Sequence, residues 1–261
     1  MGTICRDRLR RVVVLAALWA VAAVGSVGTG RADEYLGADP ALPLTVEDAF
    51  VPDPRAVDVK LRHIYDHGRD GRDRFEPSAE AEVGIVPGLS ASVGFSYRLG
   101  DAGDADSGEA SFGAKWNFLA AGRRWPALAV TATVLAPYGY ENDTTEADLA
   151  LLASQPLGDG ENPPYLHANL VWAHAFGEAA EARKDRYVAV LGFGFPVAAD
   201  TAVLFDAVRE QRAERGRYDN LIEVGMLHQF GNALLLAGGV GVGVGNSDTD
   251  LRIFFGLMRP F

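Results

Sequence analysis

Residues 89–99 alternate between apolar and polar or small side chains. One set of positions holds Leu89, Ala91, Val93, Phe95, Tyr97 and Leu99, and the positions between them hold serine, glycine and Arg98. Successive side chains of a β-strand point to opposite faces, so this pattern predicts a strand with one apolar face. Residues 75–85 and 109–119 repeat it, and Pro87 and Gly88 form a tight turn between the first two strands. Runs of about ten residues have the length that a tilted barrel strand needs to cross a bilayer.

Further alternating runs predict eight more strands, which cover residues 56–65, 127–136, 165–176, 186–196, 200–210, 219–229, 232–244 and 250–261. The total is then odd, whereas a single-chain bacterial barrel normally has an even number of strands and two periplasmic termini. Residues 145–155 supply the missing strand, because Leu149 and Leu151 can face lipid while Asp148 and Ser154 face inward. The local pattern suits an amphipathic loop helix equally well, and the parity of the barrel favours the strand.

The connections support a barrel of about twelve strands. With that number, the short connections near Pro87, Ala198 and Gly231 fall on the periplasmic side, and the charged segments 101–109, 177–185 and 211–219 fall outside. The prediction is therefore an all-β, antiparallel, up-and-down transmembrane barrel over residues 55–261. A secreted soluble β-sandwich is the alternative, since its strands would also alternate; it predicts two sheets and a polar exterior.

The start of the chain predicts export. Residues 1–32 have a basic start, an apolar run from Val12 to Val24 and small residues before Ala32, which are the three parts of a signal peptide. We place cleavage after Ala32, and a cut near Gly28 would also satisfy the requirement for small residues. The apolar run is too short for a helical anchor, which needs about 20 residues. The only cysteine, Cys5, lies in this segment. Residues 33–54 are then an extended periplasmic segment that is long enough to enter the barrel as a lumen plug.

The net charge of the predicted mature chain bears on which partners it can bind. Cleavage would remove five arginines and Asp7 from 24 basic and 35 acidic residues, which leaves 19 basic and 34 acidic residues. A strongly acidic mature chain makes a nucleic-acid partner improbable. We instead expect the bacterial outer membrane as the location and its lipid as the surroundings.

The chain ends in a strand that carries an assembly signal. In LRIFFGLMRPF, Leu251, Ile253, Phe255, Leu257 and Phe261 share one face. A terminal aromatic residue on an alternating last strand is the usual signal by which the outer-membrane assembly machinery accepts a barrel. Phe261 is therefore the candidate signal and that machinery the expected partner.

Five stretches together resemble the bacterial outer-membrane family known as MetA pathway of phenol degradation, a family of suspected transporters. The stretches are LPLTVEDAFVPDP, AEAEVGIVPGLSASVGFSYR, GEASFGAKWNFL, YLHANLVW and DLRIFFGLMRPF. One departure is LAPYG at residues 135–139, where the family more often has a proline, threonine, glycine turn. The resemblance implies a barrel that moves small compounds, hydrophobic or aromatic ones among them, across the outer membrane. It implies no catalytic residues.

The strand phases direct a set of polar side chains toward the lumen. They are Glu80, Glu82, Arg98, Lys115, Asn117, Asn169, Glu223 and Arg252. Mixed charges inside a barrel can line a water-filled path or pair into a network that closes it. Both outcomes suit twelve strands, a number between side-chain-filled eight-strand barrels and open porins. The predicted function is a channel for small solutes, with a closed structural barrel as the alternative.

An outer-membrane lipid hydrolase is a rival from another class. His174 and His228 fall on the predicted lipid face near strand ends, where such an enzyme needs its base, but no serine can be paired with either from sequence. His63 and His67 have HxxxH spacing that runs from a strand into a loop and does not predict a metal site. The glycine runs lack the helix of a phosphate loop. We therefore predict no enzyme activity, cofactor or metal.

Overall fold

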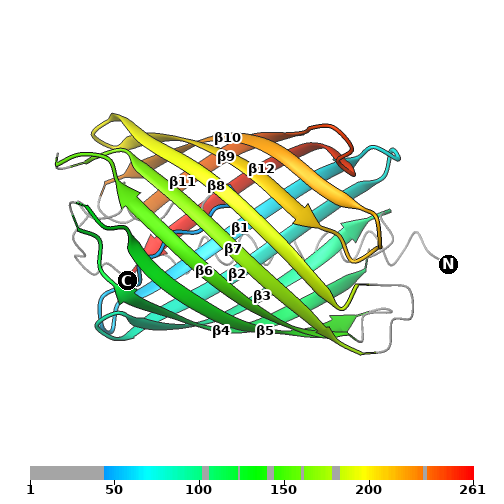
Figure 1. Ribbon diagram of the computed structural model, residues 1–261, viewed down its shortest axis with the longest axis horizontal. Coiled ribbons are helices and arrows are strands. Elements are labelled where there is room, and N and C mark those ends of the chain that lie inside the picture. Colours follow the sequence, from blue (N-terminus) through cyan, green and yellow to red (C-terminus); the bar gives the residue numbers. More distant parts are fainter. Residues whose placement is uncertain are drawn as a thin grey trace.

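The computed structural model describes residues 44–101, 106–122, 124–139, 144–159, 162–177, 183–231 and 234–261 (Figure 1). The predicted signal peptide and residues 33–43 lie outside the described residues. A search of the described residues finds no helix with the length and apolar character that a membrane span requires.

Twelve strands make up the fold. They are β1 (Val57–Gly68), β2 (Asp73–Val86), β3 (Leu89–Gly100), β4 (Ser107–Leu119), β5 (Ala127–Gly139), β6 (Thr145–Pro156), β7 (Tyr165–Phe176), β8 (Asp185–Ala198), β9 (Thr201–Gln211), β10 (Tyr218–Phe230), β11 (Leu234–Gly243) and β12 (Thr249–Pro260). The strands tilt steeply around one axis (Figure 1). The prediction of about twelve strands is confirmed, including the strand at residues 145–155. The predicted end of the first strand is wrong, because β1 continues to Gly68 and keeps His67 on the strand.

Each strand pairs antiparallel with its neighbour in sequence, and β1 closes the sheet against β12. In that closing pair Asp58 faces Pro260 and Asp66 faces Arg252. The terminal Phe261 adds backbone bonds to Val57, whose N–H lies 3.2 Å from the Phe261 carbonyl oxygen. Closure leaves no unpaired sheet edge, the condition that a β-structure must meet inside a bilayer.

The outward face of the sheet is apolar around the barrel. Each strand from β2 to β12 exposes at least one large apolar side chain, among them Ile85, Phe95, Phe112, Val134, Leu151, Leu170, Leu191, Phe205, Ile222, Val240 and Ile253. A soluble protein rarely exposes a continuous belt of this kind. The sandwich alternative is wrong, because the strands form a single closed sheet rather than two sheets.

The two ends of the barrel differ in their connections. The proximal end, where β1 begins and β12 ends, carries the connections 87–88, 120–126, 157–164, 199–200 and 231–233. The distal end carries 69–72, 101–106, 140–144, 177–184, 212–217 and 244–248. The predicted separation is confirmed: the short turns near Pro87, Ala198 and Gly231 share the proximal end, and the predicted charged segments share the distal end.

Candidate functional site

Residues 44–54, here called the lumen segment, lie inside the barrel. At the C-terminal end of the segment, Pro54 bridges Gly84, and the Arg55 N–H donates to the Gly84 carbonyl at 2.8 Å. A Cβ at Gly84 would overlap the carbonyl oxygens of Pro52 and Asp53. Only glycine leaves room at this position for a second backbone to pass so closely. Leu44, Val46, Asp48 and Ala49 are all buried.

Side chains from several strands of the wall hold the backbone of the lumen segment. The Glu223 carboxylate of β10 accepts from the Thr45 N–H and hydroxyl at 3.2 and 2.9 Å, and Asp206 of β9 accepts from the Val46 N–H at 2.8 Å. Asn169 of β7 accepts from the Glu47 N–H and donates to the Glu47 carbonyl, both at 2.7 Å. The wall therefore replaces the water that these backbone groups would otherwise bind.

Two further contacts continue this series toward β4. Ser154 of β6 accepts from the Ala49 N–H at 3.0 Å, and the Asn117 amide of β4 donates to the Ala49 carbonyl. The segment thus crosses the strands from β10 to β4. All of these bonds except that of the Thr45 hydroxyl join the backbone of the segment to a wall side chain, so the wall specifies the register of the segment.

Apolar side chains of the lumen segment fill three clusters on the inner wall. Leu44 packs with Leu204, Leu227, Leu235, Ala237, Phe254 and Met258. Val46 packs with Val190, Val208 and Leu221. Ala49 packs with Ala127, Ala129, Ala150 and Leu152. The inner wall beneath the segment thus carries three apolar clusters beside its polar anchoring side chains, and the packing removes that apolar surface from the water of the lumen.

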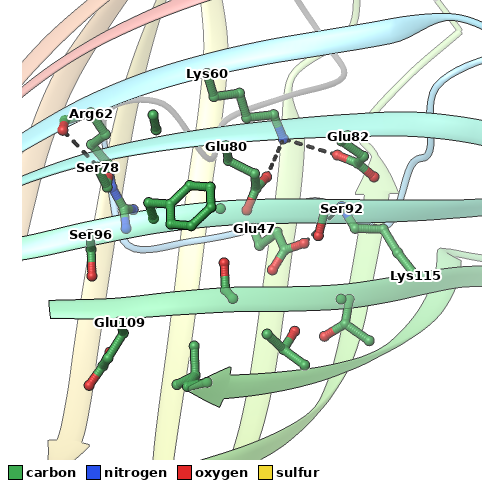
Figure 2. A pocket seen from close by; sticks show the side chains of 18 of the residues that line it. Glu47, Lys60, Arg62, Ser78, Glu80, Glu82, Ser92, Ser96, Glu109 and Lys115 are labelled. Carbon is green, nitrogen blue, oxygen red and sulfur yellow. Dashed lines mark hydrogen bonds and ion pairs between the residues drawn. The ribbon is translucent and has the colours of Figure 1, made fainter. Parts of the chain in front are cut away.

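A cavity of about 440 Å³ remains in the lumen beside the segment (Figure 2). Its wall comes from β1 to β5, and Thr45, Val46 and Glu47 of the lumen segment border it. The lining is rich in hydroxyl groups from Ser90, Ser92, Ser96, Ser111, Thr131 and Thr133. The segment therefore occupies one side of the lumen and leaves a polar space on the other.

Ion pairs surround this cavity. Lys60 lies 3.2 Å from Glu82 and 3.8 Å from Glu80, and Figure 2 shows both pairs. Arg98 lies 3.2 Å from Glu76 and 3.0 Å from Glu109. In these pairs each cation contacts two carboxylates.

Lys115 connects the cavity wall to the lumen segment. Its ammonium lies 2.8 Å from the Glu47 carboxylate and 3.9 Å from that of Asp48. Lys115 is buried, and an unpaired buried charge would be costly, so the segment carboxylates stabilise this part of β4.

A second network lies on the β12 side of the lumen. Arg252 makes a two-point contact with Asp66, at 2.6 and 3.1 Å, and lies 3.6 Å from Glu223. Arg74 also binds Asp66, at 2.6 Å. Because Glu223 in turn binds Thr45, this network connects the barrel's closing strand pair to the lumen segment.

The structure places all eight predicted lumen residues inside the barrel, in two groups. Glu80, Glu82 and Lys115 line the cavity, and Arg98 pairs with two of its lining glutamates. Of the other four, Asn117, Asn169 and Glu223 contact the lumen segment directly, and Arg252 lies behind Glu223.

Sequence reasoning missed Lys60, Arg62 and Asp206. Lys60 and Arg62 alternate with the outward Val59 and Leu61, and Asp206 alternates with the outward Phe205, so the signal is present. This alternation is hard to recognise because other inward positions on the same strands, such as Ile64 and Leu204, are apolar. They belong to the cluster that packs against Leu44.

The histidines on the outward face bond no serine among the described residues. His174 lies 2.9 Å from Asp185, and His228 lies 2.8 Å from the Thr201 hydroxyl. Ser154 does meet a histidine, His167, at 2.8 Å, but this serine is fully buried and already accepts from Ala49. The hydrolase hypothesis thus gains no outward nucleophile and base in the described part of the chain. Nor do the described residues contain a group of three or more metal-ligating side chains.

A closed twelve-strand antiparallel barrel with an apolar exterior and a polar, partly filled lumen is the fold of the bacterial outer-membrane β-barrels. Among solved structures, the chain is similar to the KdgM porin in complex with disordered oligogalacturonate, with a TM-score of 0.57 and 11% identity over 78% of this chain and 99% of that one. It is also similar to an outer membrane channel from Pseudomonas putida, with a TM-score of 0.55 and 12% identity over 82% and 97%.

The β domain of the Bordetella autotransporter BrkA has a TM-score of 0.51 and 11% identity over 78% of this chain and 98% of that one. No protein-family model and no curated protein matches the chain. Identities this low establish the shared fold only. Membership of the phenol-degradation family therefore stays a prediction from sequence.

Proposed function

We propose that the protein is an outer-membrane channel that passes small polar solutes through the space beside its lumen segment. The observation that carries the proposal is the cavity of about 440 Å³ between that segment and β1 to β5. A barrel filled only by its own side chains would leave no such space. Two of the similar structures are a porin and a channel, which supports a transport role for this fold.

The lining of the cavity favours polar solutes over hydrophobic or aromatic ones. Hydroxyl groups and charged side chains dominate it, with Glu80, Glu82, Lys60 and Lys115 among them. An apolar solute would desolvate these groups without replacing their hydrogen bonds. The hydrophobic solutes that the sequence resemblance implies are therefore the second choice.

The closed structural barrel is the competing proposal, and one observation favours it. The lumen segment is bonded to five strands of the wall, through Glu223, Asp206, Asn169, Ser154 and Asn117. If no continuous path runs beside it, the barrel does not conduct.

Conductance measurements on the purified, refolded protein in planar bilayers separate the two proposals. We expect discrete conductance steps that are small for a barrel of twelve strands, because the segment occupies part of the lumen. Liposome swelling with neutral solutes of increasing size should show flux of small solutes only. If neither discrete steps nor swelling above protein-free liposomes is seen, the closed barrel is correct and the channel proposal fails.

The proposal includes export and assembly. Residues 1–32 act as the signal peptide, residues 33–54 as the periplasmic segment whose described part plugs one side of the lumen, and residues 55–261 as the barrel in outer-membrane lipid. The half-exposed Phe261, at the end of the strand pair that closes the sheet, acts as the signal for the assembly machinery.

A further inference from the structure

One row of inward-facing side chains crosses the wall of the cavity. Arg62 of β1 pairs in register with Ser78 of β2, Ser78 with Ser96 of β3, and Ser96 with Glu109 of β4. Figure 2 shows the four residues toward the same side of the cavity. The row thus brings a guanidinium, two hydroxyl groups and a carboxylate onto one side of the space.

Arg62 differs from the other cations at the cavity. Lys60, Lys115 and Arg98 each pair with carboxylates. Within the described residues, no carboxylate lies within ion-pair distance of the Arg62 guanidinium, and the guanidinium donates no hydrogen bond. The Ser78 hydroxyl lies 3.4 Å from the Arg62 backbone carbonyl and leaves the side chain of Arg62 unengaged. An arginine in a lumen position that lacks a protein partner is available to bind a carboxylate of a solute in a two-point contact.

The rest of the wall suits a hydroxylated molecule. The next row pairs Gly94 with Ser111, and the row after it pairs Ser92 with Gly113 and Gly113 with Thr133. All five residues line the cavity, and the two glycines contribute no side chain to it. A Cβ at Gly94 would lie 2.5 Å from the Ser111 hydroxyl, so the glycines keep these hydroxyl groups accessible. On any one strand, the inward-facing residues of neighbouring rows are about 7 Å apart, a distance that a short polyol chain can bridge.

The charges of the lining disfavour a ligand that carries more than one negative group. Five carboxylates line the cavity, from Glu47, Glu76, Glu80, Glu82 and Glu109, against three lining cations, Lys60, Arg62 and Lys115. Arg98 adds a fourth cation that pairs with Glu76 and Glu109, so one carboxylate remains in excess. A second negative charge on the solute would face this excess of carboxylates, whereas hydroxyl groups can donate to them. Glu80 is suitably placed as an acceptor, because its side chain is 41% exposed.

We propose that the cavity binds small monocarboxylates that carry several hydroxyl groups, with Arg62 holding the carboxylate and the serine and threonine hydroxyls holding the polyol chain. This inference deepens the proposed channel function, on which it rests, by naming the solute class and the residue that selects it. Arg62 acts as a specificity residue for the anionic end.

Isothermal titration calorimetry on the detergent-solubilised full-length protein tests the site with matched probes. Gluconate carries the carboxylate, sorbitol has a neutral hydroxymethyl group at the same carbon, and glucamine has an aminomethyl group there. We expect gluconate to bind more tightly than sorbitol or glucamine. Arg62→Gln should weaken gluconate binding about tenfold, because a charged hydrogen-bonding partner is lost, and should leave sorbitol binding unchanged.

Two control variants separate this effect from a general change of charge or fold. Arg62→Lys keeps the charge and should retain part of the preference for gluconate. Arg209→Gln makes the same chemical change on the outward face, where Arg209 bonds Asn220, and should bind gluconate as the unaltered protein does. Heat-modifiable gel mobility confirms that each variant is folded.

The inference is overturned if gluconate does not bind, if it binds no better than sorbitol, or if Arg62→Gln binds it unchanged. Its failure is distinguishable from that of the channel. Gluconate binding without conductance would contradict the channel function and support the binding site. Conductance without Arg62-dependent gluconate binding would support the channel function and contradict the binding site.

Discussion

Removal of residues 33–54 should convert a narrow channel into a wide one. The deletion takes away the lumen segment and leaves all twelve strands, because β1 begins at Val57. The side of the lumen that Leu44, Val46 and Ala49 now fill would become water-filled. We expect single-channel conductance to rise several-fold, and solutes excluded by the unaltered protein to enter proteoliposomes in swelling assays.

A milder variant controls for unintended effects of the deletion. Asn169→Ala removes both bonds to the Glu47 backbone and leaves the chain length unchanged. Each buried backbone group left without a partner costs about 1–3 kcal/mol, so this variant should raise the conductance in the same direction by less. Equal conductance in the deletion variant and the unaltered protein, with both folded by gel mobility, would show that the segment does not limit the path.

A charge placed on the outward face should reduce stability and assembly, whereas the same charge one residue away should not. Val134 in the middle of β5 is 47% exposed on the apolar exterior, and Thr133 beside it lines the cavity. An arginine at the bilayer midplane of a barrel costs about 2–4 kcal/mol. Val134→Arg should therefore lower the free energy of unfolding by about that amount and reduce the folded protein in outer membranes.

Thr133→Arg is the matched control, since its side chain would enter the cavity and remain solvated. We expect it to assemble as the unaltered protein does and to reduce solute flux instead. Urea unfolding in lipid vesicles, followed by tryptophan fluorescence, measures the difference. If both variants lose the same stability, the assignment of the two faces of β5 is wrong.

The fold was predictable from sequence mainly where the two faces of a strand differ in polarity. β3 and β4 alternate cleanly because their inward side chains face the polar cavity, with Ser92, Ser111 and Lys115 among them. In β6 the pattern is ambiguous, since the inward Ala150 and Leu152 are as apolar as the outward Leu149 and Leu151. Ala150 and Leu152 pack against Ala49, a contact that no local window contains. The even strand number resolved what the local pattern could not.

Residues of the site could be predicted from sequence where a charged residue stands within an otherwise apolar strand. Glu223 and Arg252 stand out in this way, and the structure brings both close to the lumen segment. Their partners could not be assigned, because Thr45 and Glu223 are 178 residues apart in the chain. The importance of Arg62 depends on which cations already have partners. That is a property of the assembled cavity rather than of the strand.

The central claim, that the lumen segment lies against the inner wall of the barrel, is tested most directly by a disulfide. A Cβ at Gly192 would lie 3.0 Å from both Val46 methyl carbons, so cysteines at these positions come within disulfide reach. In a Cys5→Ala background, Val46→Cys with Gly192→Cys should give an internal link, detected in outer membranes by non-reducing electrophoresis and peptide mass spectrometry. Val46→Cys paired with the outward Gly238→Cys should not link. Folded protein in which residues 46 and 192 stay unlinked under oxidising conditions would contradict the account.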